Sequence, residues 1–149
     1  MKIIAMPTRR APKILILESQ MIIAADVSLQ FSKLGYDVIG IHTRSEDTLK
    51  TIEDNRPDIV VMSIELPGEE SGLRTARILL ETCRIPVVFI SANTDRKIFK
   101  EVIAARPYAF ISKPFEKKDL QRGIETALKR MVAEGLWDKR YKGDLIKPH

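Results

Sequence analysis

Five short apolar runs are spaced along the chain, and a longer amphipathic stretch follows each of them. The runs are Lys13–Leu17, Asp37–Ile41, Asp58–Met62, Pro86–Ile90 and Tyr108–Ile111. Continuous apolar runs of this length are typical of strands that are buried on both faces of a parallel sheet. The pattern therefore predicts five strands.

The stretches between the runs have the spacing of amphipathic helices. In the first of them, apolar side chains recur at Met21, Ala24, Val27, Phe31 and Leu34, and Gly35 follows as a stop. Thr43, three residues before Glu46, predicts a capping box at the start of the second helix. The expected helices are 20–34, 43–55, 71–82, 95–105 and 116–133. This alternation predicts an α/β fold, a doubly wound parallel sheet with helices on both faces.

Composition narrows the class of protein. The 149 residues are enough for one domain, and 44% hydrophobic with 30% charged residues are typical of a globular protein. No apolar run approaches the roughly 20 residues of a membrane span, and no apolar segment typical of a signal peptide follows the first basic residues. The single cysteine, Cys83, favours a cytoplasmic location.

Charge and metal-ligand residues exclude further classes. The net charge is +5, with much of the excess near the two ends of the chain. Aromatic and basic residues are not interleaved, which argues against a nucleic-acid-binding surface. The two histidines stand apart from Cys83 and from each other, so the sequence predicts no zinc site and no cofactor.

Polar side chains end four of the five predicted strands. In an open α/β sheet, ligands bind in the crevice at the carboxyl ends of the strands, so these side chains should converge there. They are Glu18, Ser19, Ser63, Glu65, Ser91 and Lys113.

The motifs around these positions resemble the receiver domain of two-component response regulators. The resemblance extends from Lys13 to about residue 130 and rests on ILILES, RPDIVVMSIELPG, IPVVFISA and FISKPF. It implies a flavodoxin-like five-stranded sheet in the order 2-1-3-4-5 and a cis bond between Lys113 and Pro114. It also implies that Ser91 is the switch hydroxyl and that Phe110 is at the switch aromatic position.

Two positions depart from the family pattern. Ser63 stands where the family has its phospho-accepting aspartate, and Ser19 replaces the second member of the acidic pair. A serine hydroxyl needs a base to become a nucleophile, and we expect the stem of Glu65 to be poorly placed for that role. Phosphoryl transfer also depends on Mg²⁺, which prefers carboxylate ligands. The sequence therefore predicts a degenerate, pseudo-receiver pocket with no catalytic residue, no metal and no enzymatic activity.

The side chains of the pocket also have purely structural interpretations. Ser19 and Ser91 are candidate N-caps for the helices that follow them. A lysine in a partly buried crevice needs an anionic partner, so we expect Lys113 to pair with Glu18, Glu65 or the Ser63 hydroxyl.

Three functions remain open from the sequence. The first is a signalling module that binds a protein partner, or a second copy of itself, through the face of the fourth helix, fifth strand and fifth helix. Its alternative is a sensor of small anions or metabolites in the serine and lysine crevice, and the third is nucleic-acid binding through the basic ends. The expected divisions are a basic extension (1–12), the receiver-like domain (13–133) and a tail or linker (134–149).

Overall fold

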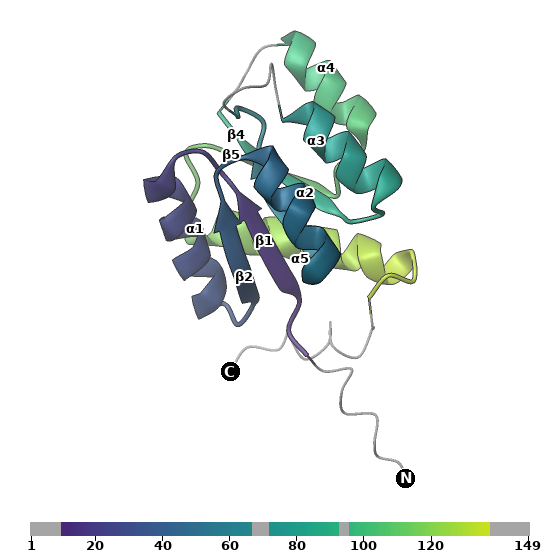
Figure 1. The fold of residues 1–149 in the computed structure, drawn as a ribbon. Coiled ribbons are helices and arrows are strands. Elements are labelled where there is room, and N and C mark those ends of the chain that lie inside the picture. The colour runs from purple at the N-terminus through teal and green to yellow at the C-terminus, as the bar shows by residue number, and fades with distance from the viewer. Residues whose placement is uncertain (1–9, 67–71, 93–95, 138–149) are drawn as a thin grey trace.

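The central element is a five-stranded sheet in which every neighbouring pair is parallel. The computed structural model describes residues 10–66, 72–92 and 96–137, apart from the side chain of Lys97. The strand order is β2-β1-β3-β4-β5 (Figure 1). The strands are β1 (Lys13–Leu17), β2 (Asp37–His42), β3 (Ile59–Ser63), β4 (Val87–Ser91) and β5 (Ala109–Ser112). The predicted flavodoxin-like order is confirmed, as is the cis peptide bond between Lys113 and Pro114.

Helices cover both faces of this sheet. They are α1 (Met21–Lys33), α2 (Ser45–Asp54), α3 (Leu73–Arg77), the π-helical turn η2 (Ile78–Thr82), α4 (Arg96–Ala105) and α5 (Lys117–Ala133). One hydrophobic core joins the sheet to α1 and α5, and a second joins the opposite face to α2, α3 and α4. Successive side chains of a strand point to opposite faces, so Ile14 and Ile16 enter the first core whereas Leu15 and Leu17 enter the second.

The capping of α2 and α5 differs from the sequence prediction. The capping box at Thr43 is wrong, because α2 begins at Ser45 and its N-cap, Arg44, makes no side-chain capping bond. Glu46 and Asp47 lie in the first turn instead, where negative charge favours a helix N-terminus. A capping box does occur at α5, where the Glu116 side chain and the Asp119 side chain each bond the other residue's backbone N–H.

Both ends of the described chain meet at the amino-terminal edge of the sheet. The guanidinium of Arg10 donates to both carboxylate oxygens of Asp58, at 2.7 and 3.0 Å. The same guanidinium lies 4.9 Å from the centre of the Trp137 ring, which packs against the first core. Trp137 of the tail therefore packs on the domain, whereas Tyr141, Leu145 and Ile146 lie outside the described residues.

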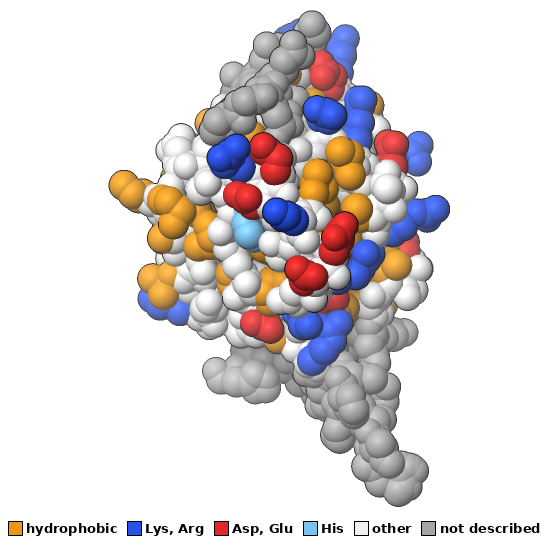
Figure 2. All heavy atoms as spheres, in the orientation of Figure 1, with side chains coloured by type: hydrophobic (Ala, Val, Ile, Leu, Met, Phe, Trp, Pro, Cys, Tyr) orange, Lys and Arg blue, Asp and Glu red, His pale blue; other side chains and the backbone are white. Residues whose placement is uncertain are grey.

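The surface combines charged side chains of both signs with exposed apolar side chains. Figure 2 shows acidic and basic side chains mingled over α2 and its neighbours, and apolar side chains gathered over α1 at the left. Large exposed apolar residues on α1 are Met21, Ile22 and Leu29. No helix in the described part of the chain is both long and apolar enough to cross a membrane.

Candidate functional site

The residues that end or follow β1, β3, β4 and β5 lie at one edge of the sheet, as the topology requires. Parallel strands bring their carboxyl ends to the same edge, so these residues form what we call the strand-end crevice. It comprises the six residues predicted from the sequence, Glu18, Ser19, Ser63, Glu65, Ser91 and Lys113. Two sets of contacts organise it.

The first set is an ion pair between Lys113 and Glu18. The Lys113 ammonium donates to Glu18 Oε1 at 3.0 Å, and the side chains are only 14% and 5% exposed. The backbone N–H of Gln20 donates to the other carboxylate oxygen of Glu18, also at 3.0 Å. The predicted partner of Lys113 is therefore confirmed as Glu18.

This ion pair passes over two intervening strands. Glu18 follows β1 and Lys113 follows β5, and the sheet order places β3 and β4 between them. Neighbouring strands are about 4.8 Å apart, so both long side chains are needed to close the distance. The ends of the two spanned strands are Ser63 and Ser91.

The second set of contacts centres on the carboxylate of Glu65. The Ser63 hydroxyl donates to Glu65 Oε1 at 3.3 Å and accepts the backbone N–H of Glu65 at 3.2 Å. The Ser91 hydroxyl donates to Glu65 Oε2 at 2.5 Å. Both serines are 1% exposed, so one carboxylate bridges two buried hydroxyls on adjacent strands.

This bridge corrects one expectation from the sequence. We expected the stem of Glu65 to be poorly placed to serve Ser63, yet its carboxylate accepts the Ser63 hydroxyl. The distance of 3.3 Å exceeds the usual 2.5–3.0 Å of an O–H···O bond, whereas the bond from Ser91 is short. Glu65 therefore binds Ser91 more closely than Ser63.

Ser19 and Phe110 have structural placements that differ from those of the bridged serines. Ser19 is half-buried and is not the N-cap of α1, because that position belongs to Gln20, which makes no side-chain capping bond. Ser91 ends β4 and is not adjacent to α4, so its interpretation as an N-cap is also wrong. Phe110 lies in β5 and packs, partly buried, against the second core.

Gly72 supports the crevice and was not identified from the sequence. Its N–H donates to the carbonyl oxygen of Ile64. A Cβ at this position would lie 2.5 Å from the carbonyl oxygen of Ser63, closer than such atoms approach in proteins. Glycine therefore allows the start of α3 to pack directly on the backbone that carries Ser63. The residue type is a clue, but only the fold shows what it contacts.

The carboxylates of the crevice do not fit a magnesium site of the kind that the family implies. Mg²⁺ needs octahedral oxygen ligands, usually including one or two carboxylates. All four oxygens of Glu18 and Glu65 already accept hydrogen bonds from protein groups. Among residues 10–66, 72–92 and 96–137, no group of three or more His, Cys, Asp or Glu side chains could hold a metal ion.

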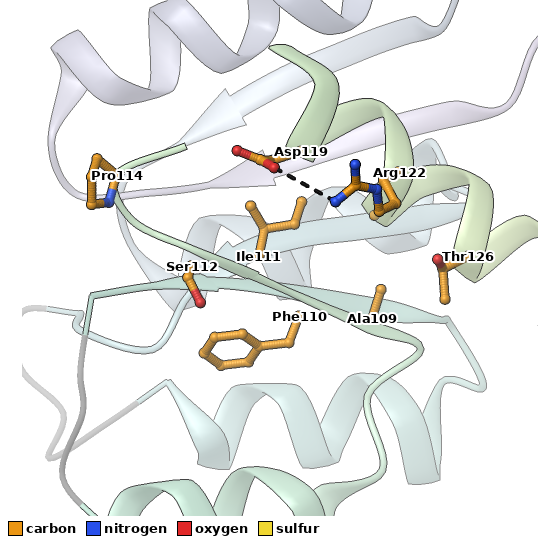
Figure 3. Close-up of a pocket in the computed structure, with 9 residues that line it drawn as sticks. Ala109, Phe110, Ile111, Ser112, Pro114, Asp119, Arg122 and Thr126 are labelled. Atoms are coloured by element: carbon orange, nitrogen blue, oxygen red, sulfur yellow. Dashed lines mark ion pairs between the residues drawn. The ribbon is translucent and has the colours of Figure 1, made fainter. Parts of the chain in front are cut away.

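A groove of about 450 Å³ lies between β5 and α5, on the face where the sequence predicts an interface. Ile111 points toward α5, whereas Phe110 and Ser112 point to the opposite side of the sheet (Figure 3). Asp119 and Arg122 form an ion pair at 4.0 Å on the helix. The lining residues are Ala109, Phe110, Ile111, Ser112, Pro114, Asp119, Arg122, Gly123 and Thr126.

A second polar cluster, at the far end of α5, was also missed from the sequence. The Tyr108 hydroxyl donates to Glu134, and the Arg130 guanidinium lies 3.8 Å from the centre of the Tyr108 ring. Arg130 also pairs with Glu134 at 2.9 Å. Burial, together with the Glu134 carboxylate, raises the pKa of Tyr108 to about 12, and the hydrogen bond from Tyr108 lowers the pKa of Glu134. The i,i+4 spacing of Arg130 and Glu134 was the available sequence clue.

Comparison with known proteins gives a family match over most of the chain. The model of the response regulator receiver domain matches residues 14–125. The signal receiver domain of a modulated diguanylate cyclase from Desulfovibrio desulfuricans superposes with a TM-score of 0.77 at 33% identity. That alignment covers 83% of this chain and 98% of the other.

Two curated relatives are longer than this chain. The phyllosphere-induced regulator PhyR of Methylorubrum extorquens is 35% identical over 119 residues, which are 79% of this chain and 44% of PhyR. The transcriptional regulatory protein PdtaR of Mycobacterium tuberculosis is 26% identical over 79% of this chain and 57% of PdtaR. The chain thus spans about half the length of these relatives.

Proposed function

Because this chain belongs to the family of response regulator receiver domains, we propose that it is a receiver that signals by binding a protein partner without phosphorylation at Ser63. The family places it among signal-transduction modules. The names of two relatives, PhyR and PdtaR, describe regulators, which supports a regulatory role. In this proposal the chain is not an enzyme and uses no cofactor.

The observation that carries the proposal is the state of the strand-end crevice. Ser63 supplies a hydroxyl where the family has a carboxylate, and a hydroxyl must lose its proton to attack phosphorus. Glu65 is within reach as a base, but its carboxylate also accepts a short bond from Ser91. Lys113, which would meet a phosphoryl oxygen, is neutralised by Glu18.

The missing metal ligands support the same conclusion independently. Phosphoryl transfer depends on cations that neutralise charge on the moving group. Ser19 contributes no carboxylate, and the oxygens of Glu18 and Glu65 are committed to protein donors. A receiver that lacks both the acceptor carboxylate and the metal ligands has lost two parts of the same reaction.

Treatment with acetyl phosphate and Mg²⁺, followed by intact-mass measurement, tests this proposal. We expect the unmodified chain to gain no phosphoryl group and its amide spectrum near Glu18, Ser63 and Glu65 to be unchanged by millimolar Mg²⁺. The matched control is the double variant Ser19→Asp with Ser63→Asp, in which we expect Mg²⁺ binding to return. Stoichiometric phosphorylation of the unmodified chain would reject the proposal.

The partner surface that we propose is the face formed by α4, β5 and α5. The groove between β5 and α5 opens on this face, and Phe99 and Ile103 on α4 are 51% and 58% exposed. Arg96 and Lys100 add exposed positive charge beside them. Apolar anchors with a charged surround are typical of protein interfaces. A signalling protein or a second copy of this chain could occupy the face.

A pull-down from the native cell, with variants of two exposed apolar residues, tests the surface. Phe99→Asp should lower partner recovery at least about tenfold, as expected when a central apolar anchor is lost. Ile22→Asp, an equivalent change on α1, should leave recovery unchanged, because Ile22 is 87% exposed on another helix. The opposite pattern would place the interface on α1.

A further inference from the structure

The strand-end crevice contains two buried hydroxyl donors that share one carboxylate acceptor. Ser63 and Ser91 donate to different oxygens of the same Glu65 side chain, at 3.3 and 2.5 Å. Glu65 lies only two residues after β3, and its side chain turns back toward the ends of β3 and β4. The two oxygens therefore occupy the position in which an external oxyanion would meet both hydroxyls.

Resting on the function proposed above, we propose that the crevice is a latent oxyanion site and that Glu65 is its internal occupant. The carboxylate satisfies the hydroxyls of Ser63 and Ser91, and it ties the end of β3 to the end of β4 without any ligand. The chemical class that the emptied site would take is a small tetrahedral oxyanion such as inorganic phosphate.

The charge of the crevice also disfavours the binding of an external anion. The crevice contains two carboxylates, Glu18 and Glu65, but only one ammonium, Lys113, so these three side chains together have a net negative charge that repels anions. Truncation of Glu65 leaves only the neutral pair of Glu18 and Lys113. It also removes the acceptor of the buried Ser63 hydroxyl, which is costly unless water or an anion replaces it.

The site differs from an arbitrary group of surface hydroxyls. Ser63 and Ser91 are each 1% exposed and are held by adjacent strands in parallel register. Gly72 packs against the Ser63 carbonyl oxygen and so restricts the backbone on that side. The donors are therefore positioned by the sheet, and Glu65 itself is an exposed residue, so we expect the donors to stay in place when its side chain is shortened.

Titration of the full chain with inorganic phosphate at constant ionic strength, followed by amide shifts at Ser63 and Ser91, tests the proposal. Wild type should show no saturable shift. Glu65→Ala should bind phosphate saturably, at least about tenfold more tightly than the weakest binding that the titration can detect in wild type. Glu65→Ser, which also opens the position but keeps a polar side chain, should behave like Glu65→Ala and provides a second variant if the first folds poorly.

Three control variants distinguish the effect of emptying the Glu65 position from the effect of removing its charge, and from phosphate binding elsewhere on the protein. Glu53→Ala removes one exposed carboxylate near the end of α2, at the opposite edge of the sheet, and should behave like wild type. Glu65→Gln keeps the size of the side chain without its charge and should bind more weakly than Glu65→Ala. The double variant Glu65→Ala with Ser91→Ala should lose the gain in affinity.

The outcomes distinguish this inference from the proposed function. Saturable phosphate binding by wild type, no gain in Glu65→Ala and Glu65→Ser, or equal binding by Glu65→Gln and Glu65→Ala would each overturn the inference. None of these results adds a phosphoryl group to Ser63. The proposed function is rejected instead by covalent phosphate on the unmodified chain, which mass measurement detects separately.

Discussion

Lys113 and Glu18 are each other's main electrostatic partner in a largely buried setting. Their 3.0 Å contact leaves little water around either charge. Removal of one member of such a pair leaves the other as an uncompensated buried charge, which commonly costs about 3–5 kcal/mol. Removal of one member of the pair should therefore destabilise the fold more than replacement of both members.

We predict that Lys113→Ala lowers the free energy of unfolding by roughly 3 kcal/mol, since Glu18 is left buried and charged. The double variant Glu18→Gln with Lys113→Met should lose less, because no charge remains buried. Urea denaturation measures both. Lys118→Ala is the matched control, since Lys118 and Glu116 are more than two-thirds exposed and should contribute less than about 1 kcal/mol. Equal losses for Lys113→Ala and Lys118→Ala would contradict the prediction.

Tyr108 should give the stability an alkaline limit. Its pKa is raised from 10.0 to about 12, first by burial and then by Glu134. The folded state therefore favours the neutral phenol, and this contribution is complete below pH 10 and is lost as pH rises toward 12. Tyr108→Phe should remove this part of the alkaline decline in stability. Urea denaturation at pH values below 10 and near 12 checks the expectation, and an unchanged decline in the variant would refute it.

Side chains of the crevice were predictable to different degrees. The partner of Lys113 could be narrowed to three groups, because a buried ammonium requires an anion or another acceptor, and Glu18 is one of the three. The double contact of Glu65 was not predictable. It depends on the direction of a side chain in a loop after β3, which no periodicity specifies.

At the scale of elements, the junction between β3 and α3 depends on a glycine. Gly72→Ala places a methyl group 2.5 Å from the Ser63 carbonyl oxygen, and a backbone atom cannot move aside without displacing the strand end. We predict a loss of about 1–3 kcal/mol in the free energy of unfolding, with amide shifts at Ser63. Thermal or urea denaturation and amide spectra of the variant measure the two effects.

Gly123→Ala is the matched control for this prediction. A Cβ there would lie 2.6 Å from Cδ1 of Ile111, which is the end of a flexible side chain. Alanine is also better than glycine in a helix by about 1 kcal/mol, which offsets part of the repacking. Gly123→Ala should thus cost less than Gly72→Ala and leave the amide of Ser63 unshifted. A larger loss at Gly123 would show that the approach at Gly72 is tolerated.

Strands were easier to predict than helix ends. Each predicted strand agrees with the structure to within one residue at either end, because an apolar run that is buried on both faces has an abrupt boundary. Helix starts depend on single capping contacts, and at α2 the predicted contact does not form. The π-helical turn after α3 was also unpredictable, since its residues have the same apolar spacing as a continuous α-helix.

At the scale of the whole molecule, two sources of information combined to predict the topology. The alternation of strands and helices indicated a parallel sheet with two covered faces, and the resemblance of the strand-end motifs supplied the order. The contact between Arg10 and Trp137 was not predictable, because it joins residues at opposite ends of the sequence.

The meeting of Arg10, Asp58 and Trp137 makes the described polypeptide almost a closed ring. The Arg10 guanidinium is 4.9 Å from the Trp137 ring, and both lie at the edge of the sheet opposite to the strand-end crevice. A short peptide joining these ends should therefore allow the chain to be reopened elsewhere, as in a circular permutant. A permutant with new ends between α2 and β3 should keep the same sheet order.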